Sequence, residues 1–304
     1  MRIRIGTRRS RLALAQAEEV SSRLASDGVE AEIVPMVTSG DRGASSDRSP
    51  AGVKGLFVAE IVAALQRGDV DLAVHSAKDL PSEDPEGIIV AAVPERADPF
   101  DVMVTRGPDP LGPGAIVGTS SLRRRAQLLR LNPDLAVVPL RGNVDTRLRK
   151  LEAGEVDAVV LAAAGLNRLG LAPPAARPLS LDEMVPAPGQ GTLAVQARED
   201  DEDVRAIVGR LDHHRSRVAF EAERMLVARL GGGCSLPLGA YAEEREAGVR
   251  LLAVVVRPDG SDLLWAQAEA PTPDQVANEV AETLLSDGAD AILASVRMPG
   301  AQTG

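Results

Sequence analysis

Two successive blocks in which short apolar runs alternate with helix-period segments constrain the fold of this chain more than any other feature. In the first block we expect strands over residues 2–6, 32–38, 71–75 and 88–93. Ser10 can cap a helix that carries apolar residues down to Leu24, and residues 56–66 also have helical character. Alternation of this kind is typical of parallel sheets that are covered by helices.

The same pattern restarts beyond a break at residues 94–99, where two prolines and three charged residues interrupt any regular element. Strands are expected over 102–105, 115–118, 136–140 and 158–162, and helices over 121–131 and 144–153. A second break spans residues 185–191. Two breaks around one α/β unit suggest a chain that leaves the first unit and returns to it, with residues 192–209 completing that unit. Ligands of such paired units usually lie in the cleft between them.

A different pattern begins near Asp212. A helix over 216–230 leads into three glycines, and runs over 251–256 and 263–268 flank the hairpin signal Pro258-Asp259-Gly260. A helix over 273–286 and a last strand over 291–296 follow. We therefore predict the α/β class with three domains, which is consistent with a length of 304 residues. The predicted domains are residues 1–95 with 192–210, residues 99–186, and a smaller α+β domain over 212–304.

Composition excludes several function classes. A formal charge of −10 and an aromatic content of 2% argue against general binding of nucleic acid. A single cysteine rules out an internal disulfide, no signal-peptide pattern opens the chain, and no apolar run is long enough to cross a bilayer. We expect a soluble cytoplasmic protein without membrane or nucleic-acid partners.

One basic island stands out in this acidic chain. Residues 118–150 hold eight cationic side chains against two carboxylates, a net charge of +6, which suggests an anionic ligand. Thr119, Ser120 and Ser121 can cap the helix that begins there, but the three cations in its first turn, Arg123, Arg124 and Arg125, oppose the helix dipole. A bound carboxylate or phosphate at that helix start would resolve the conflict. The alternative is a solvated face.

Other cations follow strands in the same way. Arg141 and Arg147 flank the next strand-to-helix turn, Arg168 follows a third strand, and Arg8 follows the first. Several anion sites that converge on one cleft imply a ligand with several negative groups.

Two further sites can carry chemistry. The pair Lys78-Asp79 directly follows a buried strand, so Asp79 could act as an acid or base or could stabilise a cation; an ordinary surface pair is the alternative. Cys234 lies in the run Gly231-Gly232-Gly233-Cys234, which favours an exposed loop and covalent chemistry, although lone cysteines are often inert and buried. With three histidines and one cysteine, we predict no metal site.

Six motifs carry a resemblance to a known family: Gly6-Thr7-Arg8-Arg9-Ser10, Lys54-Gly55-Leu56-Phe57, His75-Ser76-Ala77-Lys78-Asp79-Leu80-Pro81, Gly118-Thr119-Ser120-Ser121-Leu122-Arg123-Arg124, Leu140-Arg141-Gly142-Asn143-Val144 and Gly232-Gly233-Cys234. In this order, and over nearly the whole chain, they closely resemble the porphobilinogen deaminase, or hydroxymethylbilane synthase, family. Arg11 stands where the family commonly has proline, and Ala77 where a larger residue is frequent. Neither departure removes a proposed catalytic group.

The resemblance implies two periplasmic-binding-protein-like α/β domains around an arginine-lined cleft, with the smaller domain presenting the cysteine. It implies one dipyrromethane cofactor per chain, bound covalently to Cys234 through a thioether and built from the substrate. It also implies a transferase of tetrapyrrole biosynthesis that condenses porphobilinogen stepwise, with loss of ammonia, and releases the linear tetrapyrrole hydroxymethylbilane by hydrolysis. Each added ring brings an acetate and a propionate, so the arginine excess suits the growing polyanion.

The resemblance also assigns residue roles. Asp79 would be catalytic, contacting pyrrole nitrogens, stabilising the cationic azafulvene that forms as ammonia leaves, and assisting proton loss. Cofactor-binding residues would be Lys78, Ser76, Thr119, Ser121, Arg123 and Arg124. Substrate-binding residues would be Arg8, Ser10, Gln16, Arg141, Arg147, Arg168 and Gln190. Lys54 and Phe57 would belong to a lid formed around the polar segment 39–54.

Two other functions stay open at this level. A non-catalytic binding protein for a small polyanionic ligand would share the paired domains and the anion cleft, but would leave Cys234 unmodified and Asp79 dispensable. RNA binding through the basic island is weakened by the scarcity of aromatic residues. By resemblance we expect a monomer.

Overall fold

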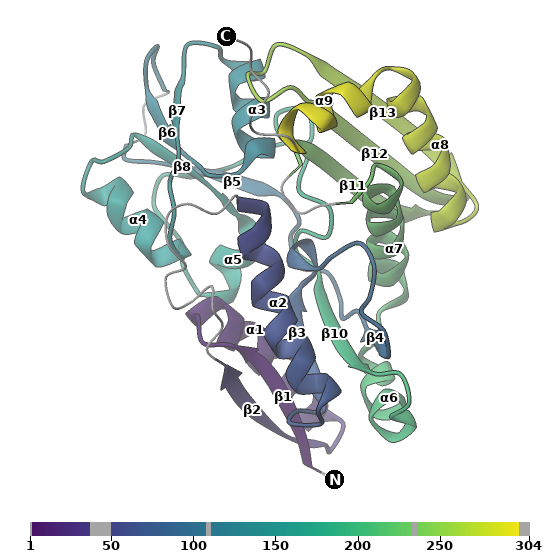
Figure 1. Ribbon diagram of the computed structural model, residues 1–304. Coiled ribbons are helices and arrows are strands. Elements are labelled where there is room, and N and C mark those ends of the chain that lie inside the picture. Colours follow the sequence, from purple (N-terminus) through teal and green to yellow (C-terminus); the bar gives the residue numbers. More distant parts are fainter. Residues whose placement is uncertain (1, 37–49, 108–110, 233–235, 298–304) are drawn as a thin grey trace.

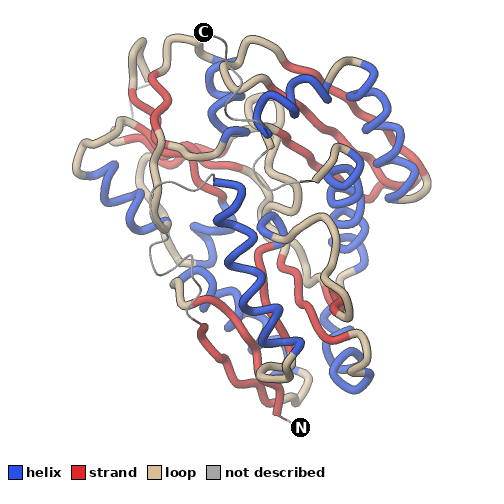
Figure 2. The backbone as a smooth tube through the Cα atoms, in the orientation of Figure 1, coloured by secondary structure: helices blue, strands red, loops and turns tan. Residues whose placement is uncertain are grey.

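The computed structural model describes residues 2–36, 50–107, 111–232 and 236–297, with only the backbone of residues 50–57 and 297. Its helices and strands form three sheet-containing parts (Figures 1 and 2). The N-terminal lobe lies at the bottom of Figure 1, the second lobe at upper left and the third part at upper right. In the described part of the chain, no helix combines the length and the apolar character that crossing a membrane requires.

The N-terminal lobe is built on a five-stranded sheet of order β2-β1-β3-β10-β4. Helices α1 and α6 pack on one face of this sheet and α2 packs on the other, so that both faces are buried. The strands are β1 (Arg2–Arg8), β2 (Glu30–Met36), β3 (Leu72–Ser76), β4 (Ile88–Ala92) and β10 (Leu193–Arg198). The helices are α1 (Arg11–Ser26), α2 (Pro50–Gln66), α6 (Glu202–Val208) and the short 3₁₀ turns η1 (Ala77–Asp79) and η2 (Gly209–Leu211).

The second lobe repeats this plan with a sheet of order β7-β6-β8-β5-β9. Helix α3 packs on one face, and α4 and α5 pack on the other. The strands are β5 (Asp101–Thr105), β6 (Ile116–Gly118), β7 (Ala136–Val138), β8 (Ala158–Ala162) and β9 (Ala176–Pro178). The helices are α3 (Leu122–Leu131), α4 (Val144–Glu152) and α5 (Ala163–Arg168).

One strand in each lobe runs against the others. β10 is antiparallel to β3 and β4, and β5 is antiparallel to β8 and β9. Each of these two strands enters its sheet directly from a connection between the lobes. The expectation of purely parallel sheets is therefore wrong at these two positions, whereas the expected pair of α/β lobes is confirmed.

The third part is a three-stranded antiparallel sheet of order β11-β12-β13 that is covered on one face by helices. Its strands are β11 (Leu238–Arg245), β12 (Gly248–Val256) and β13 (Leu263–Ala270), and its helices are α7 (His214–Arg229), α8 (Pro273–Ser286) and α9 (Ala289–Arg297). The other face of β12 packs on α3 through Leu252, Val254 and Ala126. This part is the smaller α+β domain that we expected.

The strand predicted over 291–296 is wrong, because these residues belong to α9. Ile292 and Leu293 are 1% exposed and pack into the same core as α8. A short apolar run cannot by itself distinguish a strand from a buried helix, and this run lies on the helical side of that ambiguity. Strand β11 is the main element that the sequence did not predict.

Strand membership supports the domain division drawn from the sequence. Strands β1 to β4 share a sheet with β10, whereas β5 to β9 form a separate one. We retain the boundaries 1–95 with 192–210, 99–186 and 212–304 as a proposal.

Candidate active site

A pocket lies where all three parts of the molecule meet. It has an empty volume of about 730 Å³, open solvent included. The first lobe contributes Ala77, Lys78, Leu80, Pro81 and Ser82, and the second contributes Ser121 and Arg123. The remaining lining residues come from the second inter-lobe connection, α7 and the start of β11: Ala187, Pro188, Gly189, Phe220, Arg224, Val227, Leu236 and Leu238. The predicted location at the ends of strands, between the lobes, agrees with this position.

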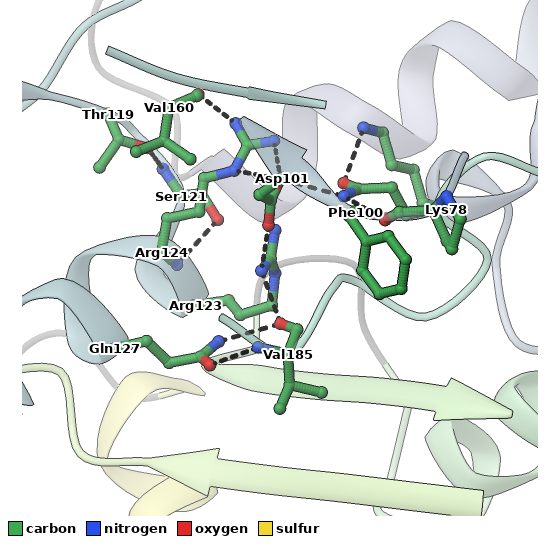
Figure 3. A network of polar contacts seen from close by, with 12 residues as sticks. Lys78, Phe100, Asp101, Thr119, Ser121, Arg123, Arg124, Gln127, Val160 and Val185 are labelled. Atoms are coloured by element: carbon green, nitrogen blue, oxygen red, sulfur yellow. Dashed lines mark hydrogen bonds and ion pairs between the residues drawn. The ribbon is translucent and has the colours of Figure 1, made fainter. Parts of the chain in front are cut away.

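A buried carboxylate, Asp101, organises the wall from the second lobe (Figure 3). Its oxygens accept hydrogen bonds from Arg123 Nη1 at 2.7 Å and from Arg124 Nη2 at 2.7 Å and Nε at 3.1 Å. Arg123 also donates to the carbonyl of Val185, and Arg124 to that of Val160. These contacts fix both arginines behind the first turn of α3.

The charges around Asp101 do not balance. Asp101 is 0% exposed, and burial alone would raise the pKa of its carboxyl, but the guanidinium groups of Arg123 and Arg124 hold that pKa well below its usual range. Two cations therefore share one carboxylate in a buried site. The sequence predicted that a ligand would supply the anion at this helix start, whereas the protein supplies one itself and leaves one positive charge in excess.

Hydroxyl groups complete the start of α3 as predicted. Ser121 is the N-cap residue, and its Oγ accepts the backbone N–H of Arg124 at 3.4 Å. The Oγ1 of Thr119, a buried residue, accepts the N–H of Ser121 at 3.1 Å. Ser121 also lines the pocket, so its hydroxyl hydrogen can still be donated to a ligand.

Gln190 connects the two lobes across the pocket. Its Oε1 accepts from Lys78 Nζ at 3.3 Å, and its Nε2 donates to Asp101 Oδ1 at 3.0 Å and to the carbonyl of Pro99 at 2.8 Å. The flanking Gly191 has φ +86°, and a Cβ there would lie 2.4 Å from the carbonyl oxygen of Ala97. Only glycine fits, and this close packing holds the Gln190 side chain between the lobes.

Asp79 ends the 3₁₀ turn that follows β3 and is half-buried. Behind it lies His75, which is 7% exposed and whose Nε2 has no hydrogen-bond partner in the described part of the chain. Burial lowers the pKa of His75 to about 4, although the carboxylate of Asp79 acts to raise it and the charge of Arg8 adds to the lowering. His75 is therefore neutral near pH 7.

The cations predicted to bind substrate fall into two groups. Arg147 is half-buried, donates Nε to the carbonyl of Gly142 at 2.8 Å, and has no carboxylate within 4.0 Å among the described residues. Burial and the charge of Arg124 lower the pKa of Arg147 to about 10. Arg141 is exposed on the same lobe. The positive charge of Arg147 is therefore not balanced by a carboxylate of the described chain, so an anionic group of a ligand can pair with it.

Arg168 is already paired. Its Nε donates to Glu19 Oε2 at 2.8 Å and its Nη2 to the carbonyl of Gly191 at 3.2 Å, so that it joins the lobes. On α1, Ser10 caps the helix by accepting the N–H of Ala13 at 3.3 Å, and Gln16 is buried. Arg8 and Ser76 end β1 and β3.

Comparisons with known proteins identify the family of this site. Residues 3–206 match the model described as porphobilinogen deaminase, dipyromethane cofactor binding domain, and residues 218–286 match porphobilinogen deaminase, C-terminal domain. The chain belongs to the porphobilinogen deaminase family. The porphobilinogen deaminase of Syntrophotalea carbinolica is 46% identical over 301 residues, covering 97% of this chain and 96% of that one. That of Geobacillus kaustophilus is 44% identical over 299 residues, covering 96% and 97%.

Some solved structures share a similar arrangement at low sequence identity. The probable amino-acid ABC transporter extracellular-binding protein ytmK from Bacillus subtilis has 9% identity and a TM-score of 0.41, covering 69% of this chain and 90% of its own.

Three residues that the family motifs mark cannot be placed. Cys234 lies outside the described residues, and so do the side chains of Lys54 and Phe57. The described residues on either side of Cys234 both lie at the pocket: Leu236 lines it, and a Cβ on Gly232 would come within 3.0 Å of Ser82 Oγ. Ser82 is itself a lining residue.

The pocket fits the dipyrromethane group named by the family model. The Nε of Arg123, which lines the pocket, is buried and has no hydrogen-bond partner among the described residues. Phe220, Leu236 and Val227 supply apolar walls suited to flat pyrrole rings. In the part of the chain that the structure describes, no three His, Cys, Asp or Glu side chains come together as a group that could hold a metal ion.

Sequence reasoning missed four residues at this junction: Asp101, which holds Arg123; Arg224, which lines the pocket; and the buried pair Arg96 and Glu223, whose Nη1 and Oε1 lie 2.8 Å apart. Asp101 opens the apolar strand Asp101–Thr105, and a carboxylate at a buried strand position needs a cationic partner. The position of this carboxylate in an apolar strand could therefore have indicated a buried ion pair from the sequence alone. The other three lie in charged stretches whose pairings only the fold determines.

Proposed function

We propose that this chain is a hydroxymethylbilane synthase, which condenses porphobilinogen stepwise with loss of ammonia and releases the linear tetrapyrrole by hydrolysis. The observation that carries this proposal is the match to both porphobilinogen deaminase domains over nearly the whole chain. The cationic pocket between the lobes supports it, because the substrate carries an acetate and a propionate.

We assign the dipyrromethane cofactor to the described pocket, with Cys234 as its attachment point. Cys234 is two residues from Gly232 and from the pocket-lining Leu236, and two extended residues span at most about 7 Å; this short separation in the sequence supports the assignment. When bound, the group supplies the nucleophilic pyrrole carbon to which new rings are added. Arg123 Nε, Lys78 Nζ and the Ser121 hydroxyl would hold its carboxylates, with Arg124, Thr119 and Ser76 supporting them.

Asp79 is proposed as the catalytic carboxylate. It lies next to the pocket-lining Lys78, at the end of a strand, where a carboxylate can face the ring nitrogens of the substrate. Loss of ammonia leaves positive charge on the substrate pyrrole, which the carboxylate stabilises before it accepts the proton that the new bond displaces. The neutral His75 behind it adds no competing positive charge near pH 7.

Arg147 and Arg141 are proposed to bind the side chains of incoming rings. Arg147 has no carboxylate partner among the described residues, so a substrate carboxylate can occupy that place. Arg168 and Gln190 bridge the lobes in this structure, and substrate contact by them requires a change of these bonds. The assignments of Arg8, Ser10, Gln16, Lys54 and Phe57 rest on the family motifs alone. We further propose a cytoplasmic monomer.

An intact-mass measurement tests the proposal. The purified protein is expected to exceed its sequence mass by two pyrrole units, and Cys234→Ser is expected to lack this excess. Asp79→Asn is expected to retain the excess and to lose most of its porphobilinogen consumption. A wild-type protein of bare sequence mass that binds small polyanions without turnover would instead support the non-catalytic binding protein.

A further inference from the structure

Arg224, in the middle of α7, makes four hydrogen bonds to a single segment of the first lobe. Its Nε and Nη2 donate to the carbonyl of Pro81 at 3.3 and 3.2 Å. Its Nη1 and Nη2 donate to the two carboxylate oxygens of Asp84, both at 2.9 Å. A bidentate pair with additional carbonyl bonds fixes orientation as well as distance.

Both ends of this contact are themselves held. The guanidinium of Arg224 lies 5.6 Å from the ring centre of Phe220, which is 3% exposed. Asp84 Oδ1 also accepts from Nε2 of Gln196, a fully buried residue of β10. The contact therefore ties the third domain to the sheet of the first lobe.

The contact joins the two segments that carry the proposed chemistry. Asp79 precedes Pro81 by two residues. On the other side, α7 ends in a Schellman motif, in which Gly231 N–H bonds to the Ala228 carbonyl and Gly232 N–H to that of Val227. Gly231 and Gly232 have φ of +85° and +64°, and the latter lies against Ser82. The helix that Arg224 fixes thus leads directly into the cysteine segment.

We propose that Arg224 is a positioning residue that sets the place of the C-terminal end of α7, which precedes the cofactor cysteine in the sequence, relative to Asp79. This inference rests on the proposed function. The side chains of Arg224 and Asp84 are 18% and 27% exposed, so they exchange little with solvent. Four of its five N–H groups are engaged with Pro81 and Asp84, unlike Arg123, whose Nε has no partner among the described residues. These bonds favour a positioning role for Arg224 over a role in binding the ligand's carboxylates.

The test compares Arg224→Met with Arg229→Met. Arg229 lies on the same helix and donates to Asp274 at 2.6 Å, a pair that stays within the third domain. Arg224→Met is expected to lower kcat by about 10- to 100-fold while KM changes less than about threefold, because a displacement on the order of 1 Å suffices for such a loss. Cofactor loading of the apoprotein with porphobilinogen, followed by intact mass, slows by a similar factor. Arg229→Met keeps wild-type values.

Asp84→Asn provides a second, milder variant that preserves shape. Asp84→Asn is expected to lower kcat as Arg224→Met does, but by a smaller factor. Arg224→Lys is expected to recover part of the kcat lost in Arg224→Met. The double variant Arg224→Met with Asp84→Asn is expected to have a kcat no lower than that of Arg224→Met alone. If Arg224 were instead a ligand for substrate, Arg224→Met would raise KM and Asp84→Asn would not. That result overturns the proposal. So does an Arg224→Met variant whose cofactor loading and kcat equal those of Arg229→Met. Should Arg224→Met fail to fold, a wild-type kcat in Asp84→Asn overturns it.

The outcomes separate this inference from the proposed function. A wild-type protein without the two-pyrrole mass excess refutes the function. A wild-type protein with that excess, together with unaffected Arg224 and Asp84 variants, refutes only the positioning role.

Discussion

Two fully buried carboxylates, Asp101 and Glu223, lie on either side of the same junction but are balanced differently. Both side chains are 0% exposed. Asp101 faces two arginines, Arg123 and Arg124. Glu223 faces one arginine, Arg96, whose Nη1 lies 2.8 Å from Oε1, and it also accepts the backbone N–H groups of Gly189 at 2.6 Å and Ala242 at 2.8 Å.

The difference distinguishes a cluster with excess positive charge, which can bind an anionic ligand, from a cluster whose charges are already balanced. The Glu223 cluster is neutral and its carboxylate is saturated with donors, so it joins α7, β11 and both inter-lobe connections as a structural element. The Asp101 cluster keeps one positive charge and, within the described part of the chain, one guanidinium nitrogen without a partner beside the pocket. A buried arginine is therefore not by itself a sign of ligand binding. An excess of positive over negative charge around it is the better indication.

Asp101→Asn gives the largest expected loss of stability. It leaves two buried guanidinium groups without a carboxylate and is expected to destabilise the second lobe by about 4–5 kcal/mol, as measured by urea unfolding. Because the variant has two uncompensated guanidinium charges where the wild type has one, phosphate bound beside the pocket-lining Arg123 is expected to restore more stability to this variant than to the wild type. Equal phosphate effects in the two proteins would contradict the charge excess.

Glu223→Gln is expected to cost slightly less, about 3–4 kcal/mol, since the amide oxygen can still accept one backbone N–H. Phosphate is not expected to stabilise this variant more than the wild type, because the Glu223 cluster does not line the pocket. The matched control is Glu221→Gln on the same helix, whose pair with Arg217 has an N–O distance of 3.6 Å and is partly exposed. That change is expected to cost less than about 1 kcal/mol.

His75→Gln is expected to alter stability only in acid. The folded pKa of about 4 lies below the usual 6.5, so the unfolded chain binds the proton more readily and stability falls as the pH drops from about 6.5 to about 4. The difference approaches about 3 kcal/mol. The variant should lose correspondingly less stability across that interval in urea titrations at several pH values. Parallel pH profiles for the two proteins would show that His75 protonates freely in the fold.

Arg147→Met is expected to change stability least, by less than about 1 kcal/mol, because no carboxylate of the described chain depends on this side chain. Its effect is expected on substrate affinity instead, with KM for porphobilinogen raised about tenfold through loss of one charge-assisted contact. Arg149→Met serves as the control, since Arg149 is exposed and, among the described residues, donates only to Thr146 Oγ1 at 3.3 Å. Equal KM values in the two variants would remove Arg147 from the substrate site.

Local pattern predicted most elements of the fold and the positions of key residues at strand ends. Lys78 and Asp79 follow β3, and Ser121 caps α3, as periodicity and capping chemistry indicated. The antiparallel strands β5 and β10 were not predicted, because their direction follows from the two crossings between lobes and not from their own residues. The run 291–296 was misassigned because an apolar segment of that length suits either a strand or a helix.

Partners far apart in sequence were beyond local pattern. Asp101 and Arg123 are 22 residues apart, and Arg96 and Glu223 are 127 apart. Charge pairing across such separations depends on the complete fold. Recognition of the family motifs supplied the expected ligand for the arginines, but not the protein carboxylate that holds two of them.

The two inter-lobe connections are bonded to each other: Ala97 N–H donates to the Gly191 carbonyl at 3.2 Å, and Arg96 Nε donates to that of Gln190 at 2.9 Å. Each connection then continues directly into the antiparallel strand of one sheet. Sliding one lobe past the other would pull a strand from its sheet, whereas turning about the paired connections leaves both sheets whole. Rotation about the paired connections is therefore the relative movement of the two lobes that keeps both sheets intact.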